Sequence, residues 1–123
     1  MSRRTKRIEH LIQREISNII LIEVSDPRLE KMTITDVKVA PDLKNATVFY
    51  TVFGDEEDRK SIRKSLRKST HFIQHYLVER LDIRYSPKIR FEYDETIDRA
   101  FEIEKKLDSI VYSNNDYPVS SDE

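Results

Sequence analysis

Cysteine is absent from this chain of 123 residues, and glycine occurs only once, at Gly54. Without cysteine the protein has neither disulfides nor thiolate metal ligands, which is compatible with a reducing cytoplasm. A single glycine excludes the glycine-rich loops whose backbone closely approaches a phosphate group. The sequence also lacks an apolar run long enough to span a bilayer, and charged residues interrupt the N-terminal segment where a signal peptide needs an apolar core. We therefore expect a cytoplasmic protein without a membrane segment.

Motifs for catalysis and metal binding are missing as well. The histidines are His10, His71 and His75, and no Gly-x-Ser-x-Gly segment occurs. His71 and His75 are four residues apart and could face one metal ion, but the Glu of a His-Glu-x-x-His motif is missing and the surrounding lysines and arginines would repel a dication. The acidic run at residues 55–58 precedes a predicted helix, where carboxylates face the positive end of the helix dipole. We expect no enzymatic activity, no metal site and no cofactor.

The nearly neutral net charge conceals four charged blocks. The chain has 22 Lys and Arg against 23 Asp and Glu, a net charge of -1. The net charge is +4 for residues 1–14, -6 for residues 15–58, +8 for residues 59–90 and -7 for residues 91–123. A local positive field attracts polyanions even when the whole molecule is neutral. The two basic blocks are therefore the first candidates for a binding surface.

Hydrophobic periodicity predicts six elements. Three segments have the apolar spacing of helices: residues 3–24, 56–81 and 94–111. Three others have the alternation or β-branched composition of strands: residues 32–40, 46–53 and 86–93. The alternation of the first strand shifts phase at Thr35 and Asp36, which predicts a β-bulge. The order helix, strand, strand, long helix, strand, helix predicts an α+β domain in which helices cover a three-stranded sheet.

The last predicted helix has an apolar face that we expect to pack against the domain. Its members are Ile97, Ala100, Phe101, Glu104, Leu107 and Ile110. Residues 112–123 are polar and have no period, so we expect a disordered tail. The domain would then comprise residues 1–111.

The densest basic stretch lies on the long predicted helix. At about 100° per residue, one group of its side chains falls within an arc of about 100° opposite the apolar face. This group consists of Lys60, Lys64, Arg67, Lys68, His71 and His75, with Arg63 in the same stretch. It extends about 22 Å along the helix, enough to follow several phosphates. Solvated helix faces usually mix both signs of charge, whereas no acidic residue occurs between Asp58 and Glu79. The pattern therefore favours binding to a polyanion over a merely solvated face.

A second basic face is predicted on the first helix. The spacing of Arg3, Arg7, His10 and Arg14 places them together, opposite the apolar side. This smaller group is as compatible with a solvated surface as with binding. If both basic faces lay on the same side of the domain, they would form a single patch.

Four ordered segments are typical of one known family. They are Arg4, Arg7 and Ile8 in Arg-x-x-Arg-Ile, Asp-Pro-Arg-Leu at residues 26–29, TITDVKVAPDLKNATVFY at residues 33–50, and LDIRYSPKIRFEYDET at residues 81–96. Together they cover roughly residues 3–111, and in this order the chain resembles ribosome-binding factor A.

The resemblance implies a type II KH-like fold with the order α-β-β-α-α-β. It also implies a non-enzymatic factor that binds 16S rRNA in late small (30S) subunit precursors and supports rRNA processing. Ordinary KH domains bind nucleic acid through a GXXG loop, which this family replaces with a kinked helix pair joined at an Ala-x-Gly step. The corresponding residues here are Ser69, Thr70 and His71, without the glycine. We still expect a bend or break there, because Ser and Thr hydroxyls can bond to earlier helix carbonyls.

From the basic faces and the resemblance together, we predict an RNA-binding surface that contacts phosphates rather than base edges. Its residues are Arg3, Arg7, Arg14, Lys60, Arg63, Lys64, Arg67, Lys68, His71 and His75. The expected partners are the small ribosomal subunit and its 16S rRNA, with ribosomal proteins as further candidates, and the expected state is a monomer. Two alternatives stay open. One is a free-standing KH-like binder of single-stranded RNA, and the other is a protein-interaction adaptor that turns its acidic last helix and tail toward basic partners.

Overall fold

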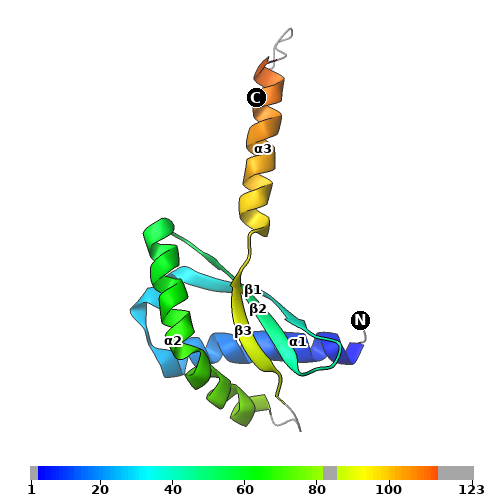
Figure 1. Cartoon of the computed structure of the whole chain (residues 1–123), viewed down its shortest axis with the longest axis vertical. Helices are drawn as coiled ribbons and strands as arrows, with labels where there is room; N and C mark the ends of the chain where they lie inside the picture. Colours follow the sequence, from blue (N-terminus) through cyan, green and yellow to red (C-terminus); the bar gives the residue numbers. More distant parts are fainter. Residues whose placement is uncertain (1–2, 82–85, 114–123) are drawn as a thin grey trace.

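A computed structural model of the chain describes residues 3–81 and 86–113, with side chains up to residue 107. The elements, shown in Figure 1, are α1 (Arg3–Ile19), the π-helical turn η1 (Ile20–Val24), the 3-10 helix η2 (Pro27–Lys31), β1 (Met32–Val39), β2 (Asn45–Val52), α2 (Glu56–Leu81), β3 (Lys88–Tyr93) and α3 (Thr96–Ser113). This order confirms the predicted α+β topology.

The three strands form one sheet in the order β1-β2-β3. β1 pairs with β2 antiparallel, and β2 pairs with β3 parallel. A parallel pair needs a crossover connection, and α2 provides it. The register of β1 shifts between Ile34 and Asp36, which confirms the predicted bulge at Thr35. The hydroxyl of the bulged Thr35 donates a 2.6 Å hydrogen bond to the Asp94 carboxylate, just after β3.

Helices α1 and α2 cover the same face of the sheet. One hydrophobic cluster joins both helices to all three strands: Ile12, Ile16, Ile19, Ile34, Val37, Val39, Ala46, Val48, Ile73, Leu77, Leu81 and Ile89. Side chains that alternate with these along the strands, such as Lys38 and Arg90, are exposed. The described part of the domain therefore has two layers, with one face of the sheet open to solvent.

The first helical segment ends where the sequence predicts. The π-helical turn η1 closes on Ser25, which has a left-handed backbone (φ 48°) and donates its N–H to the Ile20 carbonyl. Pro27 then opens η2, in which the Asp26 side chain accepts a hydrogen bond from the backbone of Arg28. Proline lacks an N–H and disfavours helix in the preceding residue, so α1 cannot continue through this segment.

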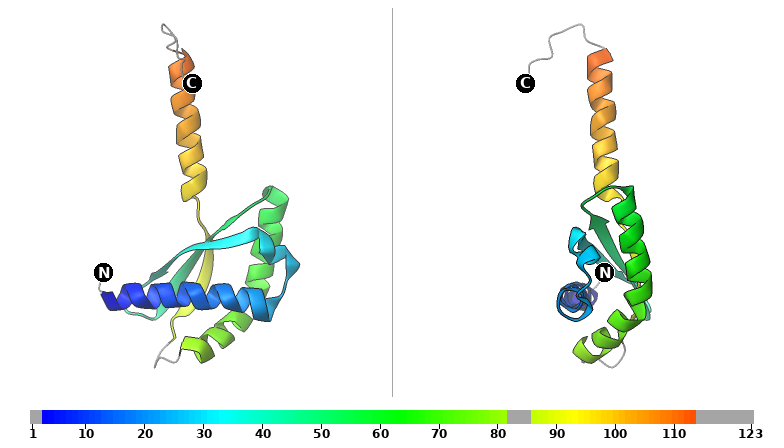
Figure 2. Two further views of the ribbon diagram at one scale, coloured as in Figure 1. Left: turned by 180° about the vertical axis from the view of Figure 1, so that it is seen from behind. Right: turned by 90° about the vertical axis from the view of Figure 1, so that its left-hand side faces the viewer.

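The long helix α2 bends but does not break. It is α-helical throughout from Glu56 to Leu81, so the helix pair implied by the resemblance is a single helix here. The Thr70 hydroxyl donates a 2.6 Å hydrogen bond to the Leu66 carbonyl one turn earlier, the type of contact that bends helices. The two views of Figure 2 show the second half of α2 turning toward α1. Arg80 holds that end through ion pairs with Glu15 and Glu23 of the first helical segment.

The prediction that α3 packs against the domain is wrong. Ile97, Phe101 and Leu107 are 46%, 60% and 55% exposed; Ala100 and Glu104 are exposed as well, and the side chain of Ile110 lies outside the described residues. Figure 1 shows α3 projecting from the end of β3. An amphipathic period shows that one side of a helix is apolar, but it does not show what covers that side. The helix also continues through Ser113, past the predicted limit at residue 111, and the rest of the predicted tail lies outside the described residues.

Replacing Ile16 with alanine should lower the free energy of unfolding by about 2–5 kcal/mol, because the lost side chain leaves a cavity. Ile16 is fully buried, whereas Leu21 in the following turn is 73% exposed. The matched Leu21→Ala change should alter stability by no more than about 0.5 kcal/mol. Urea unfolding followed by circular dichroism measures both. Equal losses for the two variants would contradict the proposed core.

Candidate nucleic-acid interface

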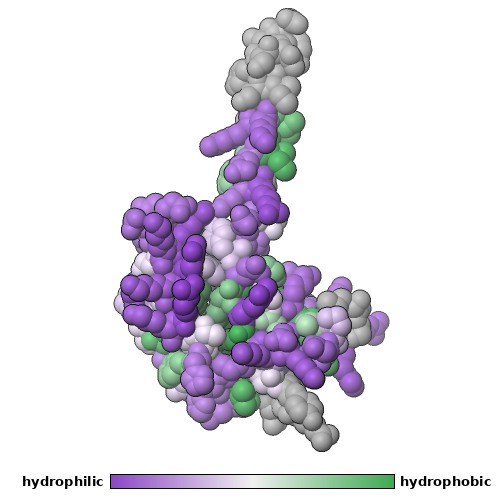
Figure 3. Space-filling model, in the orientation of Figure 1, coloured by the Kyte–Doolittle hydropathy of each residue, from purple (hydrophilic) through white to green (hydrophobic). Residues whose placement is uncertain are grey.

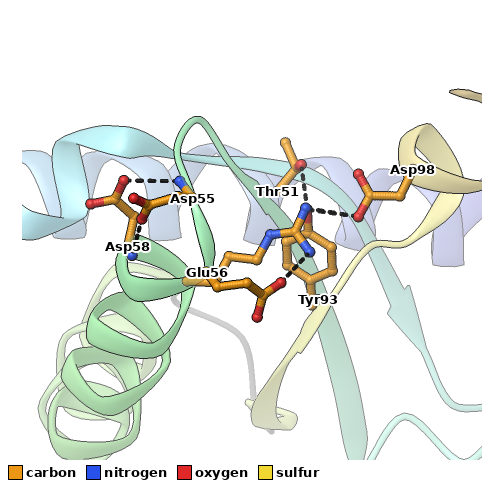
Figure 4. Close-up of polar contacts among 7 residues, drawn as sticks. Thr51, Asp55, Glu56, Asp58, Tyr93 and Asp98 are labelled. Atoms are coloured by element: carbon orange, nitrogen blue, oxygen red, sulfur yellow. Dashed lines mark hydrogen bonds and ion pairs between the residues drawn. The ribbon is translucent and has the colours of Figure 1, made fainter.

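The acidic run before α2 caps the helix. The Asp55 and Asp58 side chains each accept a hydrogen bond from the backbone N–H of the other residue, at 2.9 and 3.0 Å, as Figure 4 shows. Such a reciprocal pair satisfies N–H groups that a helix start leaves free. The pKa of Asp58 is lowered first by the hydrogen bond from the Asp55 backbone and then by Lys31. A Cβ atom at Gly54 would collide with the Asp58 carboxylate, so the only glycine of the chain makes this cap possible.

Contacts of two further residues, Ser65 and Arg59, fix the rotation of α2 about its own axis. The buried Ser65 hydroxyl donates a 2.5 Å hydrogen bond to Asp26. Arg59 lies over the Tyr93 ring, 4.5 Å from its centroid, and binds Asp98 at 2.9 Å. Because η2, β3 and α3 all hold the helix on its inner side, the basic side is turned outward. The pKa of Asp26 lies well below its ordinary value because its carboxylate accepts hydrogen bonds from Arg28 first and Ser65 second.

The structure brings the predicted residues of α2 together on one exposed surface, here called the α2 stripe. Its members are Lys60, Arg63, Lys64, Arg67, Lys68, His71 and His75. Within the described part of the chain, none of its lysines and arginines forms an ion pair with a carboxylate. His75 lies 3.9 Å from Glu79, and this contact is ionic only when the imidazole is protonated. In Figure 3, hydrophilic side chains gather along α2. The α2 stripe thus carries positive charge that the rest of the described chain does not neutralise.

A groove of about 430 Å³ lies between α2 and β3. Its lining residues are Tyr50, Arg63, Leu66, Arg67, Thr70, Ile89, Arg90, Phe91, Glu92, Tyr93 and Glu95. Burial raises the pKa of Tyr50, although the positive charge of Arg63 acts in the opposite direction. Arg90 is not among the site residues predicted from the sequence. It lies in the basic block of residues 59–90, but only the crossover places this strand residue beside α2.

The free edge of β3 borders this groove. The backbone N–H groups of Lys88 and Asp94 bond toward β2, so the alternate residues turn their backbone groups outward. At the start of β3, the Gln74 side chain of α2 satisfies two such outward groups. It accepts the Ile89 N–H at 2.8 Å and donates to the Pro87 carbonyl at 3.0 Å. The stretch from Phe91 to Tyr93 stays open to the groove. The groove therefore combines the guanidinium groups with two carboxylates, Glu92 and Glu95, of which Glu92 lies 3.6 Å from Arg90.

The predicted residues of α1 lie on a separate surface. Arg3, Arg7 and Arg14 are all exposed, and Arg14 has Glu15 at 3.9 Å. Both helices cover the same face of the sheet, but Figure 1 shows the N-terminal end of α1 and the first half of α2 at opposite ends of the domain. The two basic faces therefore do not form one patch.

A second hollow in the described surface lies away from this site. It measures about 560 Å³ and is lined by residues of α1, η1, η2 and β1, without any member of the predicted site. No group of three or more His, Cys, Asp or Glu residues in the described part of the chain could hold a metal ion. Within those same residues, no helix is long and apolar enough to cross a membrane.

Comparison with known proteins identifies the family. The sequence model of ribosome-binding factor A matches residues 4–107. The chain belongs to the ribosome-binding factor A family. It is 40% identical to ribosome-binding factor A of Halothermothrix orenii over 107 residues, which cover 87% of this chain and 88% of the relative. The protein of the same name from Nitrosococcus oceani is 34% identical over 113 residues, 92% of this chain and 89% of the relative.

Solved structures of this family share the fold. A Thermotoga maritima protein described as a candidate ribosome-binding factor A, solved by solution NMR, superimposes with a TM-score of 0.67 at 26% identity. The match covers 78% of this chain and 92% of that one. The crystal structure of ribosome-binding factor A from Thermus thermophilus gives a TM-score of 0.63 at 22% identity, over 72% of this chain and 94% of that one. These likenesses confirm the KH-like α+β fold expected from the resemblance.

Replacing Asp26 with asparagine should destabilise the domain by about 1–3 kcal/mol near neutral pH, because charged hydrogen bonds to Arg28 and Ser65 are lost. The pKa of Asp26 is lowered in the folded state, so its contribution is present above the unfolded pKa of about 4 and is lost as the pH falls further. In thermal melts from pH 7 to pH 3, the difference between the two proteins should therefore be constant above about pH 5 and should narrow progressively below about pH 4. A difference in stability that grows on acidification would refute this role.

Proposed function

We propose that this chain is a non-enzymatic assembly factor that acts in the cytoplasm on late precursors of the small (30S) ribosomal subunit. It binds their 16S rRNA and thereby supports rRNA processing. Family membership supports the proposal, and so does a Thermus thermophilus ribosome-binding factor A model that was fitted into a cryo-EM map of a 30S complex. That model matches this chain with a TM-score of 0.60 at 23% identity, over 72% of this chain and 92% of the other.

The observation that carries the proposal is the uncompensated α2 stripe. Like charges spaced along one helix face repel one another, and the described carboxylates relieve this only at His75. RNA phosphates would supply the missing negative charge. Phosphate contacts position a protein without reading sequence, which suits a factor that recognises one folded RNA by its shape.

The groove beside the stripe adds a second element to this interface. Arg63 and Arg67 belong to both the stripe and the groove, and Arg90 faces them from β3. An RNA strand that follows the stripe would therefore pass the open edge of β3 as well. We propose Arg90 as an additional RNA contact. The basic face of α1, with Arg3, Arg7 and Arg14, would reach a different part of the RNA, because it lies on a separate surface.

Binding to small-subunit RNA should weaken steeply with salt. If the stripe neutralises about six phosphates, affinity should fall roughly 10³-fold or more between about 50 and 200 mM salt, because each contact releases condensed counterions. Filter binding or fluorescence anisotropy with 16S rRNA over that range measures the slope. An affinity that stays constant over the series would rule out the electrostatic mechanism.

Replacing Lys60, Lys64, Arg67 and Lys68 with glutamate should abolish cosedimentation with immature small subunits while leaving the fold intact. All four side chains are exposed, so the change alters surface charge rather than packing, and circular dichroism with thermal melting verifies this.

A charge-matched control replaces four exposed lysines outside α2 with glutamate: Lys38, Lys44, Lys105 and Lys106. Both variants change the net charge by the same amount, so only a specific role of the α2 stripe separates them. Normal binding by the stripe variant would show that the stripe is merely a charged surface.

A further inference from the structure

Helix α3 presents a continuous apolar side that nothing in the described structure covers. Phe101, Ile103 and Leu107 are 60%, 58% and 55% exposed, and Ile97 is 46% exposed. In Figure 3, most of the hydrophobic surface that is visible on α3 lies on the side turned away from α2. So large a group of exposed apolar side chains on one helix is the usual mark of an interaction site.

Contacts in the first turn hold α3 in its projecting position. The Asp98 carboxylate accepts a 2.9 Å hydrogen bond from Arg59 and a 3.3 Å hydrogen bond from the Tyr93 hydroxyl, as Figure 4 shows. Asp94 accepts the Thr96 N–H at 2.9 Å while also binding Thr35 of β1. The base of α3 is thus tied to β1, β3 and α2. A helix that is already positioned loses less entropy when it binds a partner.

The charges of α3 argue against RNA as the occupant of its apolar side. Over the whole of α3, residues 96–113, the net charge is -1: Asp98, Glu102, Glu104 and Asp108 against Arg99, Lys105 and Lys106. This slightly negative charge gives RNA no electrostatic attraction of the kind that the α2 stripe offers. The apolar side chains, rather than a net charge, are what α3 offers to a partner.

Glu104 argues against a second copy of this chain. At about 100° per residue, Glu104 falls between Ile97 and Ala100, within the apolar side. It is exposed and forms no hydrogen bond or ion pair with any described residue. In a parallel pair of α3 helices with their apolar sides together, Glu104 would lie near the Glu104 of the other copy, and the two carboxylates would repel. A complementary surface instead needs a basic group at this point.

We infer that α3 docks in an apolar groove of a second protein, one that belongs to the small ribosomal subunit and places a Lys or Arg against Glu104. Amphipathic helices recognise such grooves through anchors spaced like Ile97, Phe101 and Leu107. The inference rests on the proposed function for the identity of the particle. It adds a protein contact to an RNA contact on a different side of the molecule. Two linked contacts raise the total affinity well above that of either one.

The decisive experiment compares intact small subunits with protein-free 16S rRNA as binding partners. The test variant replaces Phe101, Ile103 and Leu107 with glutamine. The matched control replaces Glu102, Lys105 and Lys106 with glutamine on the polar side of the same helix. Glutamine is a good helix former, so circular dichroism should show the same helix content in both variants.

We expect the apolar-side variant to lose roughly tenfold or more in affinity for the subunit, as is usual when central anchor residues are truncated. Its affinity for protein-free rRNA should be unchanged, and the control variant should bind both partners normally. Unchanged binding of the apolar-side variant to subunits would overturn the inference. An equal loss on subunits and on bare rRNA would also overturn it, because α3 would then contact RNA or support the RNA-binding domain.

Two further experiments complete the test: subunit binding by charge-reversal variants of α3, and the molecular mass of the protein in solution. Glu104→Lys should weaken subunit binding more than Glu102→Lys, because only Glu104 lies within the apolar side. Sedimentation equilibrium should give a monomer, and a dimer that the apolar-side variant abolishes would assign the surface to self-association and overturn the inference.

The α2 variants separate this inference from the proposed function. If the four-Glu stripe variant binds subunits normally, the RNA mechanism fails while the α3 result still stands. If the wild-type protein does not bind subunits at all, both the proposed function and the partner assigned to α3 fail.

Discussion

The parallel pairing of β2 with β3 is the constraint on which the rest of the domain depends. Parallel neighbours cannot be joined by a tight turn, so the chain must cross over, and α2 makes that crossing on the face already covered by α1. Because α2 buries Ile62, Leu66 and Ile73 against the sheet, its other side faces solvent. The basic stripe, the groove beside β3 and the starting point of α3 all follow from this one connection.

The contacts that stabilise α2 leave the positive charge on its outer side unneutralised. Most of the described acidic side chains near α2 are already occupied: Asp55 and Asp58 cap the helix, Asp26 holds Ser65, and Asp98 holds Arg59. Each of these contacts lies at the start or on the inner side of α2. The lysines and arginines of the outer side are therefore left unneutralised, an electrostatic cost to the free protein that a bound polyanion would relieve.

Helix α3 exposes a different kind of surface from α2. It offers apolar side chains and a net charge of only -1, and contacts at its base hold it away from the domain. In α2 the apolar side is buried and the basic side is exposed, whereas in the described part of α3 both sides are exposed. If both proposals hold, these two unlike surfaces would let one small domain contact both the RNA and the protein of a ribosomal subunit precursor.

The sequence by itself determined the elements, the bulge at Thr35 and the outward position of the α2 stripe. These features depend on local periodicity, because a helix that buries one side must expose the other. Only the tertiary structure decided that Arg90 joins Arg63 and Arg67 in a groove, since these residues meet through a crossover that brings distant segments together. It also decided that the basic faces of α1 and α2 lie apart and that no described residue covers the apolar side of α3. Periodicity shows which side of an element is apolar or charged, but what lies opposite that side depends on contacts between residues far apart in the chain.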